Sequence, residues 1–343
     1  MSRPLLDDWI AQKITGRYPL PPGDTLFTGF HRDDLERWQL DRINMTLAHA
    51  VEKSSFFRSL YGGAKLGSLS ELTELPFTTP EDLREDPYRM VCVHPNEISR
   101  IVTLKTSGST GESKRVFFTE ADLELCTDYF RHGMRNLVDE ADIVGILFPY
   151  KTPASVGDQL IRGLMRLGAE SVPLFGLSDG EISSLIRFKK ITSLVGMPKQ
   201  IAALARSYPE HRSIRTVLLS ADFVSDEVRN AIKTAWGSEV FEHYGMTEMG
   251  LGCAVSCEHQ RGYHVREADL YLEIIDPETG SPVPGGEWGE IVFTTLTRVG
   301  MPFIRYRTGD VSRWKTGRCN CGTSLKLLDY IQDRQVAKGQ ANL

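Results

Sequence analysis

The middle of the chain alternates short apolar runs with longer amphipathic segments. The apolar runs have the length and composition of buried strands, and they cover 143–148, 171–175, 192–196, 216–220 and 239–242. Helical patterns stand between them at 158–167, 181–188, 198–206 and 226–236. Strands separated by helices in this way form βαβ units with both faces of a parallel sheet covered. The alternation therefore predicts an α/β fold: a parallel sheet of βαβ type flanked by helices.

The two ends of the chain have different patterns. Apolar residues recur at helical spacing between Leu35 and Tyr61, and Thr79 is placed to cap a short helix begun by Pro80. From Gly262 onward the pattern is β-rich, with strands expected at 271–275, 290–295 and 303–307. We expect three units: a helical lead-in over 1–95, an α/β unit over 96–260, and a smaller β-rich unit over 261–343.

Composition excludes several classes of protein. A net charge of −5 argues against a nucleic-acid binder, which usually presents a basic face. The first twenty residues carry acids where a signal peptide needs an apolar run, and no stretch approaches the roughly 20 apolar residues of a membrane span. Six cysteines in 343 residues do not make a disulfide scaffold. We expect a cytoplasmic protein that binds neither nucleic acid nor membrane.

A glycine- and hydroxyl-rich segment, TLKTSGSTGESK, occupies 103–114 between two expected strands. Glycines let backbone N–H groups approach a ligand closely, hydroxyls add donors, and Lys114 adds a point charge suited to phosphate. The spacing is not that of a Walker A loop, which has a Gly-Lys pair followed by a helix. From composition alone, a solvated turn and a phosphate loop are both open.

Two further segments carry groups that a nucleotide site needs. EHYGMTE, 242–248, places an aromatic ring, a glycine, a hydroxyl and a carboxylate directly after an expected strand. IRYRTGD, 304–310, ends on an aspartate that can accept two hydroxyls at once. Taken singly, each segment has a second interpretation. The first can be a turn in which Glu248 favours a helix N-terminus, and the second can be a strand that ends in a solvated turn.

The three segments together, in this order and at these intervals, resemble the adenylate-forming acyl-CoA synthetase superfamily. The 38-residue stretch from Glu273 to Asp310 and the phrase LPFTTPEDLR are similar to the phenylacetate-CoA ligase branch. The resemblance implies that the α/β unit binds nucleotide.

It also implies roles for individual residues. Six would close over the β- and γ-phosphates of ATP: Ser107, Gly108, Ser109, Thr110, Gly111 and Lys114. Ser220, Ala221 and Asp222 would belong to the segment that lines the adenine pocket, Tyr244 would flank adenine, and Gly245 would also be a nucleotide-binding residue. Thr247 would meet the α-phosphate, Glu248 would bind Mg²⁺, and Asp310 and Arg334 would hold the ribose. Lys114, Thr247 and Glu248 would be the catalytic residues.

The implied reaction activates a carboxylic acid, by analogy an aromatic one. A carboxylate oxygen attacks the α-phosphorus of ATP, and coenzyme A then takes the acyl group from the acyl-adenylate. Tyr150, Gly245 and Met246 are the expected lining of the acyl pocket, although edge packing is equally open for Tyr150.

The family's carboxy-terminal lid is expected to be absent, because the sequence stops at Leu343, shortly after the hinge region. Two alternatives follow: a nucleotide- or adenylate-binding module without turnover, and an acyl-protein synthetase that works with a partner chain. The macromolecular partners left open are a separate lid, a carrier protein and a second copy of the chain. A kinase is the least favoured reading.

Cysteines and a histidine occur in two clusters, SCEHQRGYH and RCNCG. Cys257, His264, Cys319 and Cys321 would make a closed tetrahedral site for a structural Zn²⁺ ion. His259 or Cys253 could replace one ligand, and the alternative is a set of reduced, buried cysteines.

Overall fold

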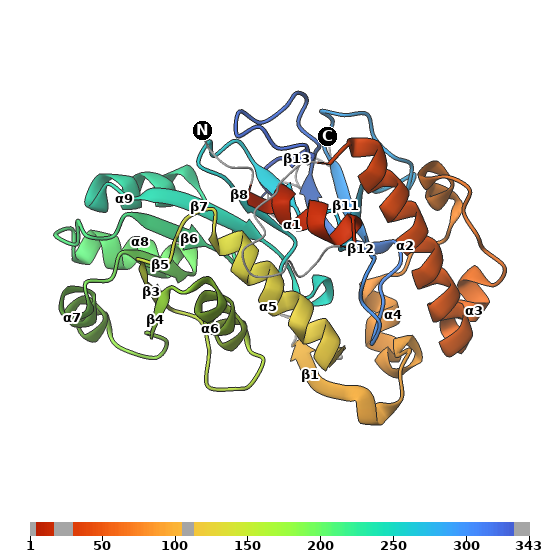
Figure 1. Ribbon diagram of the computed structural model, residues 1–343, viewed down its shortest axis with the longest axis horizontal. Helices are drawn as coiled ribbons and strands as arrows, with labels where there is room; N and C mark the ends of the chain where they lie inside the picture. Colours follow the sequence, from red (N-terminus) through yellow and green to blue (C-terminus); the bar gives the residue numbers. More distant parts are fainter. Residues whose placement is uncertain (1–4, 17–29, 105–112, 333–343) are drawn as a thin grey trace.

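The computed structural model describes residues 5–16, 30–104 and 113–332. Its largest sheet has the strand order β13-β9-β8-β7-β6-β5-β3-β4 (Figure 1). The parallel part consists of β3 (Ile143–Ile146), β4 (Glu170–Pro173), β5 (Ser193–Gly196), β6 (Thr216–Leu219) and β7 (Glu239–Tyr244). These strands confirm the predicted fold class. The sheet continues with antiparallel strands that sequence patterns did not indicate: β8 (Ala254–Ser256), β9 (Tyr263–Val265) and β13 (Leu327–Leu328).

Helices cover both faces of this sheet. They are α5 (Glu120–Met134), α6 (Val156–Leu167), α7 (Asp179–Lys189), α8 (Pro198–Ser207) and α9 (Asp226–Trp236). Neighbouring strand residues point to opposite faces, so Val195 packs with the core of α5 and α6, while Leu194 packs with that of α7, α8 and α9. A capping box formed by Thr119 and Asp122 begins α5.

The lead-in is helical, as expected. It contains α1 (Leu5–Ile14), α2 (Arg32–Lys53), α3 (Ser55–Tyr61) and α4 (Pro80–Glu85), with 3₁₀ turns η1 (Leu69–Glu74), η2 (Pro87–Met90) and η3 (Pro95–Glu97). The helical pattern over 35–61 is divided at Ser54, whose side chain accepts a hydrogen bond from the backbone N–H of Phe57 and so starts α3. Within the described ranges, no helix has the length and apolar character needed to cross a membrane.

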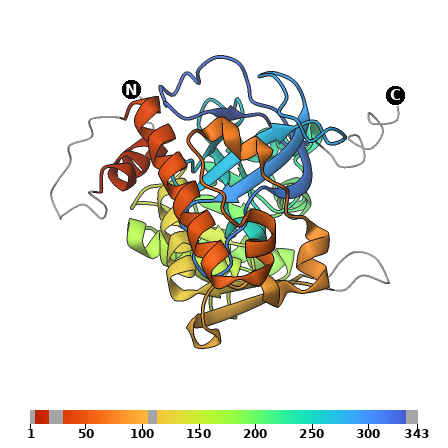
Figure 2. The ribbon, with the colours of Figure 1, turned by 90° about the vertical axis from the view of Figure 1, so that its right-hand side faces the viewer.

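Two smaller sheets complete the structure. β1 (Ile98–Leu104) and β2 (Lys114–Thr119) pair antiparallel along the lower edge of the molecule in Figure 2. The other sheet has the order β10 (Leu270–Ile275), β11 (Gly289–Thr295) and β12 (Tyr306–Ser312). The expected strand at 303–307 is wrong in position, since β12 starts at Tyr306. Arg305 has φ +46°, which interrupts the extended backbone, and its buried guanidinium pairs with Glu273 at 2.9 Å.

Candidate functional site

The carboxyl ends of β6 and β7 lie side by side, because the two strands pair in parallel up to Leu219 and Glu242. Three residues expected at the adenine pocket, Ser220, Ala221 and Asp222, follow β6, and the segment 242–248 begins inside β7 and continues beyond its end at Tyr244. A cavity of about 340 Å³ opens at this edge, and its lining includes Ala221, Asp222, Tyr244, Gly245 and Asp310. The sheet therefore gathers five of the predicted nucleotide-binding residues around one space, as expected for ligands of parallel sheets.

Tyr244 and Asp310 come from different sheets and meet in this cavity. The Tyr244 hydroxyl donates a hydrogen bond to Oδ2 of Asp310 at 3.0 Å. Burial, followed by the negative charge of Asp310, raises the pKa of Tyr244 well above its ordinary value. The phenol therefore stays protonated and acts as a donor, which fixes the orientation of the carboxylate.

Another part of the cavity wall was not predicted. Tyr263 and Tyr330 meet edge to face, with ring centroids 5.0 Å apart, and the Arg229 guanidinium lies 5.0 Å from the Tyr330 ring centre. Arg229 also pairs with Glu242 at 2.6 Å. All four residues line the cavity. Glu242 falls inside the segment 242–248, and Tyr263 falls inside the cysteine–histidine segment 256–264, where it was given no role; Arg229 and Tyr330 carry no motif of their own.

A second, apolar cavity of about 200 Å³ adjoins the first. Its wall is formed mainly by Phe130, Phe148, Val156, Leu160, Val195, Leu218 and Leu251, with Ser220, His243 and Thr247 as polar members. Four residues line both cavities: Ala221, His243, Gly245 and Met246. The half-buried side chain of Tyr150 is not among the lining residues of either cavity.

His243 stands at the boundary of the two cavities. Its Nδ1 lies 2.8 Å from the hydroxyl of Ser220. Burial, assisted by the positive charge of Arg266, lowers the pKa of His243 to about 3. The imidazole is therefore neutral at physiological pH, and it presents an uncharged surface to both spaces.

Lys114 and Glu248 form a pair beside the cavities. The Lys114 ammonium at the start of β2 contacts Oε1 of Glu248, in the short 3₁₀ turn η4 (Thr247–Met249), and the Tyr306 hydroxyl lies 3.4 Å from the same oxygen. The carboxylate is almost fully buried. Neither partner appears among the residues lining the two cavities.

Arg298 holds the two backbones that carry this pair. Its Nη1 donates to the carbonyl of Glu248 at 2.9 Å, and its Nη2 donates to the carbonyl of Phe117 in β2 at 2.8 Å. A buried guanidinium that spans both segments fixes the distance between Lys114 and Glu248. The remaining predicted phosphate-loop residues (107–111) and Arg334 lie outside the described residues.

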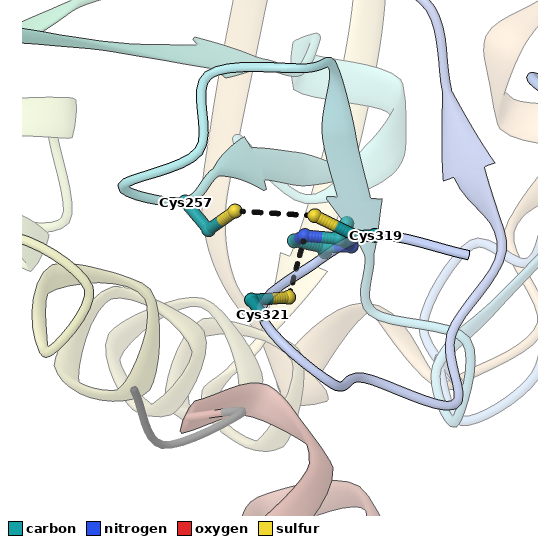
Figure 3. Close-up of side chains that lie close together, drawn as sticks. Cys257, Cys319 and Cys321 are labelled. Carbon is teal, nitrogen blue, oxygen red and sulfur yellow. Dashed lines mark hydrogen bonds between the residues drawn. The ribbon is translucent and has the colours of Figure 1, made fainter. Parts of the chain in front are cut away.

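The four predicted zinc ligands lie together in a second buried cluster. The ligand atoms of Cys257, His264, Cys319 and Cys321 are all within 4.8 Å of one another. Sγ of Cys257 is 3.6 Å from Sγ of Cys319, and Sγ of Cys321 is 3.5 Å from Nε2 of His264 (Figure 3). The two alternative ligands are not in this group; His259 lies 3.7 Å from the carboxylate of Glu258 instead.

These separations fit the geometry of a tetrahedral zinc ion. With Zn–S near 2.3 Å and Zn–N near 2.0 Å, ligand pairs stand about 3.8 Å (S–S) and about 3.5 Å (S–N) apart. A disulfide would need about 2.05 Å between sulfurs. The donor set of three thiols and one imidazole also suits zinc.

The fold and the site together define an AMP-binding enzyme. The family model with that description matches residues 45–297, and the chain belongs to this family. The phenylacetate-coenzyme A ligase of Pseudomonas putida is 31% identical over 300 residues, which are 83% of this chain and 68% of that protein. The enzyme of the same name from Escherichia coli K12 is 29% identical over 318 residues, 88% of this chain and 71% of that one.

Solved structures agree on the fold. A 2-hydroxyisobutyryl-CoA ligase in complex with 2-HIB-AMP and CoA superimposes with a TM-score of 0.81 at 23% identity, covering 93% of this chain and 73% of that one. An open conformation of a ligase of the same name gives a TM-score of 0.79 at 22% identity. The predicted resemblance to adenylate-forming enzymes is confirmed at the level of family and fold.

Proposed function

We propose that this chain activates a carboxylic acid with ATP and transfers the resulting acyl group to coenzyme A. The observation that carries the proposal is the adjoining pair of cavities at the carboxyl edge of the sheet, one with a mixed lining of charged, aromatic and apolar side chains and one mainly apolar, with four residues in common. An acyl-adenylate has the same two parts: a nucleotide, and an acyl group joined to its phosphate.

The residues divide between these parts. Ala221, Asp222 and Tyr244 contact adenine, and Asp310, oriented by Tyr244, accepts the ribose hydroxyls. A carboxylate oxygen of the acid forms a bond to the α-phosphorus while the bond from that phosphorus to pyrophosphate breaks. The thiol of coenzyme A then attacks the acyl carbon, loses its proton and releases AMP. Positioning and charge stabilisation are the chief contributions of the protein.

Lys114, Thr247 and residues 107–111 are proposed to bind the phosphates of ATP. Glu248 fits Mg²⁺ because its side chain is a hard carboxylate donor, and both of its contacts with Lys114 and Tyr306 use Oε1. When bound, Mg²⁺ supplies positive charge to the phosphate oxygens. Arg334 is proposed as a second ribose contact.

The acid is proposed to be aromatic. The apolar cavity has room for a single ring, and Gly245 and Met246 lie where that cavity meets the nucleotide cavity. The relatives from Pseudomonas putida and Escherichia coli are named for phenylacetate. Tyr150 would have to approach the acid from outside this lining.

Zinc is proposed as the ion held by Cys257, His264, Cys319 and Cys321, all buried. Four protein ligands leave no open position, so the ion would be structural. Freshly purified protein, never exposed to chelator, should contain one zinc per chain by elemental analysis; a sample without zinc would refute the site. The free cysteines and the need for ATP and coenzyme A favour a cytoplasmic location.

Exchange of labelled pyrophosphate into ATP tests the first half-reaction, with a panel of aryl, arylacetic and aliphatic acids. Acid-dependent exchange, strongest for a single-ring acid, is expected. Thioester formation with coenzyme A tests the second half. Binding of AMP without exchange for any acid would reduce the protein to a nucleotide-binding module and contradict the proposal.

A further inference from the structure

The cysteine–histidine cluster and the nucleotide cavity share one pair of short strands. His264 of β9 is opposite Leu327 of β13, and the next pair is Tyr263 opposite Leu328. Tyr263 and Tyr330, which follows β13 closely, both line the nucleotide cavity. The strands that bring the metal ligands together therefore also place the two aromatic rings of the cavity wall.

β13 is joined to β9 by a very short ladder. It comprises only Leu327 and Leu328, so its pairing to β9 rests on very few backbone hydrogen bonds. Cys319 and Cys321 lie just before it in the chain. In Figure 3 the sulfur of Cys319 faces that of Cys257, and Sγ of Cys321 lies 3.5 Å from Nε2 of His264. A metal ion bonded to Cys257 and His264 and also to Cys319 and Cys321 would join residues 257–264 to residues 319–321 far more firmly than the pairing of β9 with β13 alone.

The other side of the segment is attached independently. Asp329 pairs with Arg313 at 2.9 Å and with Lys315 at 3.0 Å, and the N–H of Gln332 donates to the carbonyl of Val311 at 3.0 Å. Loss of metal would therefore leave residues 327–332 attached towards β12 and release them from β9. The expected result is a folded protein whose cavity wall is no longer fixed.

We infer that the metal bound by this cluster sets the affinity for nucleotide, because it holds Tyr330 against Tyr263. The inference rests on the proposed zinc and nucleotide sites. The centre of the Tyr330 ring lies 5.0 Å from the Tyr263 ring centre and 5.0 Å from the Arg229 guanidinium, and the residue lines the cavity, where it offers an aromatic surface to a purine base. Tyr330 is thus assigned as a nucleotide-binding residue, and the four metal ligands as positioning residues.

The coupling must be reciprocal, since two ligands of one protein change each other's affinity by the same factor. AMP binding to the zinc-loaded protein is measured by titration calorimetry, before and after removal of the metal with a chelator. The dissociation constant of AMP is expected to rise about 5-fold or more and to recover when zinc is returned. Release of zinc to a coloured chelator is expected to slow when AMP is present.

Two variants and a control locate the effect. Tyr330→Ala should keep its zinc, bind AMP more weakly, and no longer respond to chelation. Cys321→Ser should lose zinc and bind AMP as the stripped protein does. Cys92→Ser is the matched control, because Cys92 is also a buried free cysteine but lines neither cavity; it should resemble the wild type.

The outcomes separate the proposals. Stripped protein that keeps its far-ultraviolet circular dichroism and binds AMP unchanged would overturn the coupling and leave both sites standing. Absence of zinc from fresh protein would overturn the metal site and the coupling with it, while failure of loaded protein to bind AMP would overturn the nucleotide site. If removal of zinc unfolds the chain, the Tyr330→Ala variant provides the test. A zinc-loaded variant that binds AMP as tightly as the wild type would reject the inference.

Discussion

The ammonium of Lys114 lies against the buried carboxylate of Glu248, although the two residues are 134 positions apart in the chain. One partner begins β2, and the other lies in a turn that follows β7. Arg298 bonds to both backbones, so the pair is built by the fold rather than by chance contact of surface charges. A lysine and a carboxylate held together are the groups that phosphate and its magnesium ion require.

Replacing Lys114 with methionine should lower the rate of pyrophosphate exchange by about 100-fold or more, because a preorganised charge next to the transferring phosphate is lost. Affinity for AMP, which lacks the β- and γ-phosphates, should change little. Lys189→Met, at the exposed end of α7, is the matched control and should exchange normally. Equal rates in the two variants would remove Lys114 from the site.

Replacing Asp310 with asparagine should weaken AMP binding about 10-fold or more, because a carboxylate that accepts ribose hydroxyls becomes a weaker acceptor. The wild type should bind 2′,3′-dideoxy-AMP much more weakly than AMP, and the variant should distinguish the two poorly. Calorimetry with both nucleotides measures this difference. Asp276→Asn, at a half-buried position in the turn after β10, lines neither cavity and should behave like the wild type. A variant that still prefers AMP as strongly as the wild type would show that the ribose lies elsewhere.

Replacing Val156 with phenylalanine should narrow the apolar cavity from its half-buried rim. The KM for a single-ring acid is expected to rise about 10-fold, since the volume added displaces part of the ring, while the KM for ATP stays constant. The KM for small aliphatic acids should rise less. Val299→Phe, at an exposed position, is the control. A similar rise in KM for all acids and for ATP would indicate a general disturbance of the structure and would contradict a filled cavity.

Lowering the pH should destabilise the protein through His243. The unfolded imidazole takes up its proton near 6.5 and the folded one only when its pKa of about 3 is reached, so the unfolded state binds more protons between these values. The contribution to the free energy of unfolding therefore falls, with decreasing pH, by at most about 1.4 kcal/mol per pH unit. Urea unfolding at pH 7.5 and 5.5 should show that the free energy of unfolding falls less for His243→Gln than for the wild type. Identical losses in both proteins would mean that His243 does not titrate in this way.

Local signals predicted much of the fold because they act over a few residues. The bounds of α9 match the expected 226–236, since Ser225 caps its start and Gly237, in the left-handed conformation, ends it. The expected β12 was misplaced because nothing local indicates that Arg305 turns the backbone to reach Glu273. That pair depends on contacts distant in sequence.

The candidate site shows the same division. Tyr244, Gly245 and Asp310, which line the first cavity, could be proposed from the sequence because they stand in recognisable segments. Tyr263 and Tyr330 were missed because strands of two or three residues give no periodic pattern, and the two rings meet only through the pairing of β9 with β13. The roles of the phosphate loop, Mg²⁺ and the zinc ligands remain predictions.

The wall between the two cavities has a consequence for how this enzyme can change. Ala221, His243, Gly245 and Met246 belong to both linings, and a Cβ on Gly245 would stand 2.7 Å from the Cα of Gly252. With the proposed assignment of the two cavities, mutations at these four positions would change the acid cavity and the nucleotide cavity together. In a lineage that adapts to a new acid, substitutions are therefore expected to concentrate at the residues that line the apolar cavity alone.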